Sequence, residues 1–248
     1  MSRSNPQENG SPNPATRWFE WNGENGVVRY YDKEKKETVE VGSDFTFLWL
    51  DELGSVRGWH ESSKSGIYSN EVKDTRQDVL IVKAFKGGTL AEGLYKDIKD
   101  RVNSVGGQFN ANCYIAFKNG GGQLALGSIR FKGAALGSWM EFRKAHRADL
   151  LEKAVRINGF TEGKKGRITY RMPVLSLVDV TPATNDAAIA LDKQLQSYLA
   201  GYLKKNKRDQ VEAAAQHVSD EDIAGGYEDD FDDTPHPASQ IDDSDIPF

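Results

Sequence analysis

Aromatic and basic side chains alternate in several stretches of this sequence that have the composition of β-strands. Residues 79–86 are the clearest case, because successive side chains of an extended chain point to opposite sides. One side is apolar and expected to be buried (Leu80, Val82 and Ala84), and the other side carries Lys83 and Phe85. Rings can stack on nucleic-acid bases, and cations can neutralise phosphates. Lys83 and Phe85 are therefore candidate binding residues for a nucleic acid.

Trp59 is the preferred candidate for base stacking. It lies in the polar residues 58–66, which are expected to form a loop that offers a large ring little burial. Tyr68 follows closely and completes the expected stacking pair. For most other aromatic residues we favour burial, which is the usual position of such side chains in a globular domain. This applies to the strand that carries Phe45, Phe47 and Trp49, which is apolar on both sides.

Arg130 and Lys132 are candidate phosphate ligands. In an extended chain they project together, whereas Ile129 and Phe131 point toward the expected core. Cations in this arrangement can neutralise neighbouring phosphates of one strand. The alternative interpretation is a solvated strand surface without a ligand.

A second group of cations surrounds a predicted hairpin turn at residues 163–166. Lys164 and Lys165 lie at its tip, and Arg167 and Arg171 share one side of the following strand. These four residues are also candidate phosphate ligands, with the same alternative. The basic residues 204–208 need no ligand, because cations at the end of a helix complement its dipole.

The last seven residues, Asp-Asp-Ser-Asp-Ile-Pro-Phe (242–248), form the most specific pattern in the chain. A terminal Phe supplies a large apolar anchor, the preceding Pro limits the entropy lost on docking, and the acidic residues steer the segment toward a basic groove. The pattern resembles the acidic tip of bacterial-type single-stranded DNA-binding proteins. The resemblance implies that replication and repair proteins dock on Asp242, Asp243, Asp245, Ile246, Pro247 and Phe248. A tail that only confers solubility is the alternative.

The net charge of −5 hides a strong asymmetry along the chain. Residues 211–248 hold twelve of the 37 acidic residues and none of the 32 basic ones, so residues 1–210 carry a net charge of +7. A basic body can concentrate on a polyanion, although the pI of the whole chain is about 5.5.

Hydrophobic periodicity predicts an α+β fold. Helices are expected at residues 91–105, 134–153 and 185–205. Strands are expected at residues 26–32, 38–41, 44–50, 66–72, 78–85, 108–118, 123–132, 154–161 and 167–181. The resemblance implies a β-rich, elaborated oligonucleotide/oligosaccharide-binding (OB) barrel with about three helices. We expect a disordered leader at residues 1–16, an OB-like domain at 17–208 and a disordered acidic tail at 209–248.

Few residues suggest catalysis, a metal or a cofactor. Cys113 is the only cysteine, the four histidines are scattered, and the glycine-rich residues 119–123 lack the Lys-Ser/Thr ending of a nucleotide-binding loop. We therefore predict a protein that is not an enzyme and uses no cofactor. Without an apolar run of membrane-spanning length, the expected location is the cytoplasm, that of a bacterial host if a phage encodes the chain.

These features together predict sequence-independent binding and protection of single-stranded DNA in replication, recombination and repair, with phage replication favoured. The acidic tip would recruit partner proteins, and an oligomer is compatible with the sequence. Two alternatives remain at this stage. One is an adaptor that binds replication proteins without touching DNA, and the other is a nucleic-acid enzyme such as a strand-annealing recombinase or a nuclease.

Overall fold

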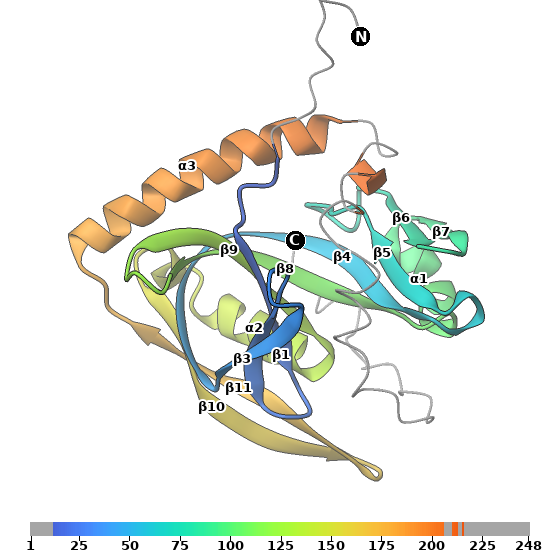
Figure 1. The fold of residues 1–248 in the computed structure, drawn as a ribbon, viewed down its shortest axis with the longest axis horizontal. Helices are drawn as coiled ribbons and strands as arrows, with labels where there is room; N and C mark the ends of the chain where they lie inside the picture. The colour runs from blue at the N-terminus through green and yellow to red at the C-terminus, as the bar shows by residue number, and fades with distance from the viewer. Residues whose placement is uncertain (1–11, 206–209, 213–214, 216–248) are drawn as a thin grey trace, which may run out of the picture.

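The computed structural model describes residues 12–205, 210–212 and 215, and it has the predicted α+β class with a predominance of strands (Figure 1). The strands are β1 (Arg17–Asn22), β2 (Val27–Asp32), β3 (Glu37–Gly42), β4 (Asp44–His60), β5 (Ser65–Ser69), β6 (Leu80–Ala84), β7 (Gly88–Gly93), β8 (Gly107–Lys118), β9 (Leu124–Lys132), β10 (Ala154–Lys165) and β11 (Ile168–Val178). The helices are α1 (Tyr95–Ser104), α2 (Gly133–Ala145) and α3 (Pro182–Lys204), with 3₁₀ turns η1 (Glu61–Ser63) and η2 (Asp149–Leu151).

The strands form one open, mixed sheet. Its order is β3-β2-β1-β9-β8-β4-β5-β6-β7, and β10 joins it by pairing with both β4 and β11. The β1–β9 pair is parallel, whereas the other pairs are antiparallel. Among the described strands, β3 and β7 at the two ends have one neighbour each, so the sheet does not close. The expectation of a closed barrel is therefore wrong.

Strand β4 is much longer than predicted, because it continues from residue 50 through to His60. The sequence here contains Asp51 and Glu52, which disfavour strands when they are considered alone. Tertiary partners compensate both carboxylates: Asp51 forms an ion pair with Lys73, and Glu52 accepts a hydrogen bond of 2.6 Å from Trp139 Nε1. Trp59 consequently belongs to a strand and not to the predicted loop.

Two predicted helices are shorter than expected, and two strands were not predicted at all. Residues 88–93 form β7, whose pairing with β6 takes up the first part of the expected helix 91–105, so α1 begins only at Tyr95. Helix α2 ends at Ala145, after which η2 leads into β10. Strand β1 was also missed, although it lies inside the sheet, between β2 and β9. Both strands have six residues, and short strands leave a weak local signal because their stability depends on packing against neighbouring strands.

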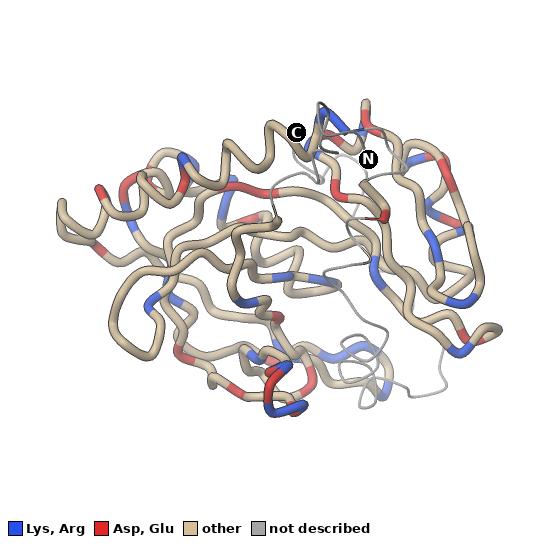
Figure 2. Tube along the Cα trace, turned by 45° about the horizontal axis from the view of Figure 1, so that its top comes forward, with Lys and Arg blue, Asp and Glu red and all other residues tan. Residues whose placement is uncertain are grey.

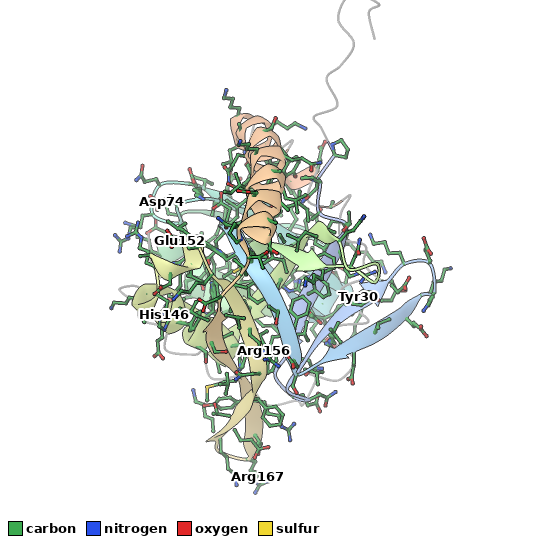
Figure 3. The ribbon with its side chains drawn as sticks, turned by 90° about the vertical axis from the view of Figure 1, so that its left-hand side faces the viewer. Tyr30, Asp74, His146, Glu152, Arg156 and Arg167 are labelled. Carbon is green, nitrogen blue, oxygen red and sulfur yellow. The ribbon has the colours of Figure 1, made fainter. Side chains whose placement is uncertain are left out.

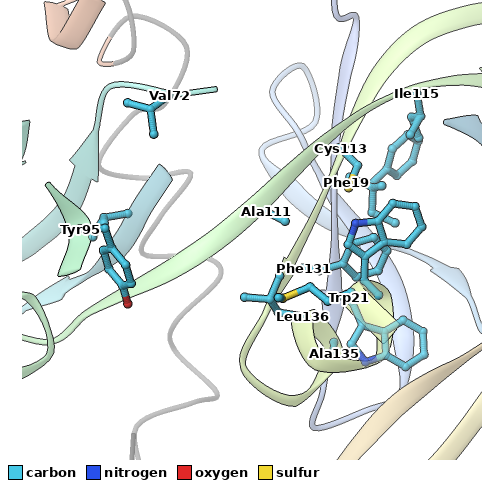
Figure 4. Packing of buried hydrophobic residues seen from close by; sticks show 14 of the residues in the cluster. Phe19, Trp21, Val72, Tyr95, Ala111, Cys113, Ile115, Phe131, Ala135 and Leu136 are labelled. Atoms are coloured by element: carbon cyan, nitrogen blue, oxygen red, sulfur yellow. The ribbon is translucent and has the colours of Figure 1, made fainter. Parts of the chain in front are cut away.

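The main hydrophobic core lies on one face of the sheet, under α1 and α2. Figure 4 shows Val72 and Tyr95 toward one end of β8 and Trp21 and Phe131 toward the other. The positions predicted to be buried are buried: Leu80, Val82, Ala84, Ile129, Phe131, Phe45 and Phe47. Trp49 packs against the same core and is half-buried.

Helix α3 packs on the opposite face of the sheet, which we call the α3 face. Its first turn is capped by Thr181, whose Oγ1 accepts a hydrogen bond of 3.2 Å from the amide of Thr184, and Pro182 follows at the first helical position. Leu195 and Leu199 are buried against residues of β4, β8 and β9. Two other apolar residues of the helix, Ile189 and Leu203, are exposed.

Acidic and basic residues are interspersed over the described trace (Figure 2). None of its helices is long and apolar enough to span a membrane.

Candidate nucleic-acid interface

The register of the strands places most of the predicted binding residues on the α3 face, in two rows. Residues directly opposite each other in neighbouring strands point to the same face. In the first row, Lys83 of β6 lies opposite Tyr68 of β5, and Tyr68 lies opposite Arg57 of β4. Arg57 in turn lies opposite Gln108 of β8.

The second row crosses the other half of the sheet. Asn112 of β8 lies opposite Arg130 of β9, which lies opposite Glu20 of β1 and, through it, Arg29 of β2. Asn112 and Gln108 are four residues apart on one strand, so both rows are on the same face. The predicted residues of β5, β6 and β9, far apart in sequence, thus lie on one surface.

The first row includes an aromatic corner, which consists of Trp59, Tyr68, Lys83 and Phe85. The rings of Tyr68 and Phe85 are in contact, with centroids 4.5 Å apart. Trp59 lies two residues beyond Arg57 on the same side of β4 and is half-buried. These four candidates from the sequence are therefore neighbours. The expected stacking pair was Tyr68 with Trp59, whereas the ring that Tyr68 contacts is that of Phe85.

Close approach of two backbones fixes the position of Trp59. A Cβ atom on Gly58 would lie 2.1 Å from the carbonyl oxygen of Gly106, and one on Gly106 would lie 2.2 Å from the carbonyl oxygen of Trp59. Gly106 also has a φ of +89°, which favours glycine. Any side chain at these two glycines would therefore displace the end of β4 and the ring that it carries.

The described residues after α3 cover part of the aromatic corner. Val211 is fully buried in a cluster with Tyr68 and Ile81, and Phe85 and Ala215 pack at its edge. We call Gln210, Val211, Glu212 and Ala215 the cover segment. Tyr68 is only 8% exposed. Its burial raises the pKa of its hydroxyl, an effect that Arg57 opposes and Glu212 reinforces. A base can reach Tyr68 only if the cover segment moves.

Gln210 anchors the cover segment to the body. Its Nε2 donates to the carbonyl oxygens of Tyr202 and Lys205 at 3.1 and 3.2 Å, and its Oε1 accepts from Asn70 at 3.4 Å. The segment is thus attached both to the end of α3 and to the loop after β5.

The second row includes a basic cluster, which consists of Glu20, Arg29, Arg130 and Lys132. Glu20 accepts a hydrogen bond of 2.8 Å from Arg29 Nε and another from Arg130. Burial alone would raise the pKa of Glu20, but the charges of Arg130, Lys132 and Arg29 outweigh burial and lower it to about 2. Three cations therefore surround one permanently ionised carboxylate, and the four residues carry a net charge of +2.

Residues between the two rows add polar groups that the sequence did not indicate. Asn110 of β8 lies opposite Lys132 and is buried. Its Nδ2 donates to the carbonyl oxygen of Gln108 at 2.8 Å, whereas its Oδ1 has no hydrogen-bond partner among the described residues. A buried acceptor without a donor is costly unless a ligand or water supplies one. Asn110 is only 1% exposed, so this acceptor lies beneath the surface and not on it.

Trp18 is a further stacking candidate, which the sequence pattern did not indicate. It precedes Glu20 by two residues on β1 and so lies on the same face. Its side chain is 37% exposed, and the ammonium of Lys33 lies 5.8 Å from its ring centroid. The only signal in the sequence was the alternation of Trp18 and Glu20 with Phe19. This alternation indicates a shared face only if the segment is a strand, as β1 is.

The β10–β11 hairpin lies away from both rows. It projects from the body, with Arg167 at its tip (Figure 3), and Lys164 and Lys165 are exposed beside it. Strand β10 runs through Gly163 to Lys165, so the reversal occurs two residues later than predicted. The hairpin cations can reach a phosphate, but the structure does not bring them together with the aromatic corner.

Arg171, the fourth hairpin candidate, has contacts within the fold. Its backbone amide donates to Gly23 at 2.7 Å, and its guanidinium pairs with Glu162 and lies 5.1 Å from the ring centroid of Phe160. Trp21 Nε1 donates to its carbonyl oxygen at 2.9 Å. These contacts attach the base of the hairpin to the turn between β1 and β2, which gives Arg171 a structural task.

A buried carboxylate connects α3 to the sheet near the candidate interface. Glu71 accepts hydrogen bonds from Tyr114 at 2.8 Å and from Asn112 at 2.7 Å, and its own amide donates to Tyr202 of α3. Burial raises the pKa of Glu71, although these two hydrogen bonds and the charge of Arg57 oppose the effect. Glu71 and Glu20 thus have pKa values displaced in opposite directions on one face of the sheet.

The predicted docking tip (Asp242, Asp243, Asp245, Ile246, Pro247 and Phe248) lies outside the described residues. Within the described residues, no group of three or more His, Cys, Asp or Glu side chains could hold a metal ion. Comparison of the chain with models of known protein families, with curated proteins and with solved structures finds no match.

Proposed function

We propose that this protein binds single-stranded DNA without strong sequence preference, and that the aromatic corner and the basic cluster, which lie outside the part of the α3 face that packs against helix α3, form the binding surface. The observation that carries the proposal is the register, which brings the aromatic corner and the basic cluster onto one face. Stacking rings combined with a cationic track is the combination that single-stranded nucleic acids require.

Each half of the surface has a different task in this proposal. The basic cluster neutralises phosphates and releases their counterions, which makes binding weaken as salt rises. Trp59, Phe85 and Trp18 stack on bases without reading their edges, so any base is accepted. Arg57 of the first row is buried, so it contributes positive charge beneath this surface and not a direct phosphate contact.

The same proposal includes the finer features implied by the acidic tip. These are an OB-like body, a role in replication, recombination and repair, and recruitment of partner proteins by the tip. The predominance of strands supports an OB-like body, although the sheet is open. The charge asymmetry of the chain supports recruitment, because an acidic tail is repelled by DNA and remains available to basic partners.

A direct test measures the affinity of the protein for oligo-dT and for a duplex of equal length over a series of salt concentrations. We expect quenching of tryptophan fluorescence by oligo-dT, tighter binding of the single strand, and a linear fall of log K with log salt. Absence of quenching and of binding at low salt would instead support an adaptor that does not touch DNA. Strand annealing or cleavage in the presence of magnesium would favour a nucleic-acid enzyme.

A further inference from the structure

Glu20 connects two arginines from neighbouring strands. Its Oε1 accepts from Arg29 Nε at 2.8 Å, and its Oε2 accepts from an amino group of Arg130. The three residues are direct cross-strand neighbours on β2, β1 and β9. Both carboxylate oxygens are thus engaged by guanidinium groups from opposite sides.

Exposure increases along this series of side chains. The side chain of Arg29 is 7% exposed, that of Glu20 is 14% exposed, and that of Arg130 is 22% exposed. Arg29 therefore forms the buried end and Arg130 the end nearest to solvent. An isolated arginine on a strand samples many rotamers, and ordering it on a ligand costs entropy. Arg130 loses much of that freedom in advance through its bond to Glu20.

We propose that Glu20 is a positioning residue for phosphodiester binding. In this arrangement Arg29 holds Glu20, Glu20 holds Arg130, and Arg130 together with Lys132 binds the DNA backbone. A guanidinium carries five N–H donors in a fixed plane, so Arg130 can donate to Glu20 and to a phosphate at the same time. The inference rests on the proposed function and adds that a carboxylate on the binding surface strengthens DNA binding.

The sign of the effect of Glu20→Gln distinguishes positioning from simple electrostatics. A carboxylate that is only a neighbour repels DNA, so its neutralisation strengthens binding, by roughly twofold. If Glu20 positions Arg130, Glu20→Gln weakens binding to oligo-dT, by roughly fivefold, because the phosphate contact loses its fixed geometry. The slope of log K against log salt then also becomes shallower, by about 0.7, the loss of one phosphate contact on a single strand.

Glu40 offers a matched control, because it lies opposite Arg29 on β3 and is exposed. Glu40→Gln removes the same charge from the end of the same row, and we expect unchanged or slightly stronger binding. A second variant, Glu20→Asp, keeps the charge and shortens the side chain by one methylene group. Positioning predicts weaker binding for Glu20→Asp, whereas electrostatics alone predicts no change in affinity. The test therefore remains decisive if Glu20→Gln folds poorly.

A double-mutant cycle locates the effect. If Glu20 acts through Arg130, then Glu20→Gln produces no further loss in a protein that already carries Arg130→Ala. Thermal unfolding of each variant verifies that the protein is folded at the assay temperature. The inference alone is overturned if the wild-type protein binds DNA and both variants, Glu20→Gln and Glu20→Asp, bind it equally well or better. Wild-type protein that binds no DNA overturns the proposed function and this inference with it.

Discussion

The aromatic corner and the basic cluster occupy the same face of one sheet but are built in different ways. In the aromatic corner, the cover segment seals Tyr68 through the buried side chain of Val211. In the basic cluster, a carboxylate holds the cations from within the sheet. The corner is thus maintained by apolar burial and the cluster by charge. Salt and pH should therefore act mainly on the cluster, whereas substitution of apolar residues should act mainly on the corner.

The largest expected effect is the loss in acid of the stability that the basic cluster contributes to the fold. The pKa of about 2 for Glu20, against an ordinary value of 4.5, corresponds to about 3 kcal/mol of stability. Because the folded-state pKa is the lower one, this contribution is present above pH 4.5 and is lost as the pH falls toward 2. We expect the stability difference between wild type and Glu20→Gln to be constant near neutral pH and to vanish in this window. Chemical denaturation at several pH values measures it, and a difference that does not change with pH would contradict the ion pairing.

Glu71 should behave in the opposite way. Its pKa is raised by burial, so its ionised form lowers stability at high pH, and this cost disappears as the pH falls through the folded-state pKa. The two carboxylates therefore make opposing contributions to the acid dependence of one domain.

Removal of the cations should separate the two regions by their salt dependence. The double variant Arg130→Ala/Lys132→Ala should weaken oligo-dT binding by about one to two orders of magnitude and reduce the salt slope by about 1.4, which is 0.7 for each lost contact. The variant Lys164→Ala/Lys165→Ala removes the same charge from the distant hairpin tip and serves as the control. Fluorescence titration measures the affinity of both variants for oligo-dT. Equal losses of affinity would mean that DNA binding depends on the net charge of the protein and not on the position of the cations in the sheet.

Trp59 should contribute to affinity without contributing to the salt slope. Trp59→Ala is expected to cost about 1–3 kcal/mol of binding free energy, the range for one base stacked on an aromatic ring, with an unchanged slope. Trp59→Phe retains a ring on the same strand and should recover most of the loss. If Trp59→Ala binds oligo-dT as tightly as the wild type, the half-buried ring belongs to the fold alone.

Val211 should control access to Tyr68, and its substitution should have the smallest effect on DNA binding. Burial of a valine side chain contributes about 1.5–3 kcal/mol, and Val211→Asp removes this contribution from the free energy that holds the cover segment in place. Val211→Asp should release the segment and strengthen oligo-dT binding, by roughly two- to fivefold. Hydrogen exchange of the β5 amides is expected to accelerate in the same variant. Val211→Ile, which keeps an apolar side chain, should bind like the wild type, and weaker binding by Val211→Asp would mean that the segment helps to hold DNA.

The candidate site could be predicted from the sequence only in part. Alternation along single strands correctly assigned Lys83 and Phe85 to one side and Leu80 and Val82 to the other, because this property depends on neighbouring residues. Arg29, Arg57 and Glu20 were missed. Their importance lies in what faces them across the sheet, and strand pairing is not written in the local pattern.

The amino-acid sequence alone determined the α+β class, the buried side of most strands, the charge asymmetry and the pattern of the last seven residues. These properties arise from residues close together in the chain. The tertiary structure decided that the sheet is open, that Trp59 lies on a strand, and that Tyr68 lies under Val211. It also placed one carboxylate between cations from two neighbouring strands. The contacts of Glu20 with Arg130 and of Tyr68 with Val211 join residues more than a hundred positions apart. The buried charge of Glu20 is compensated by partners that no local pattern reveals.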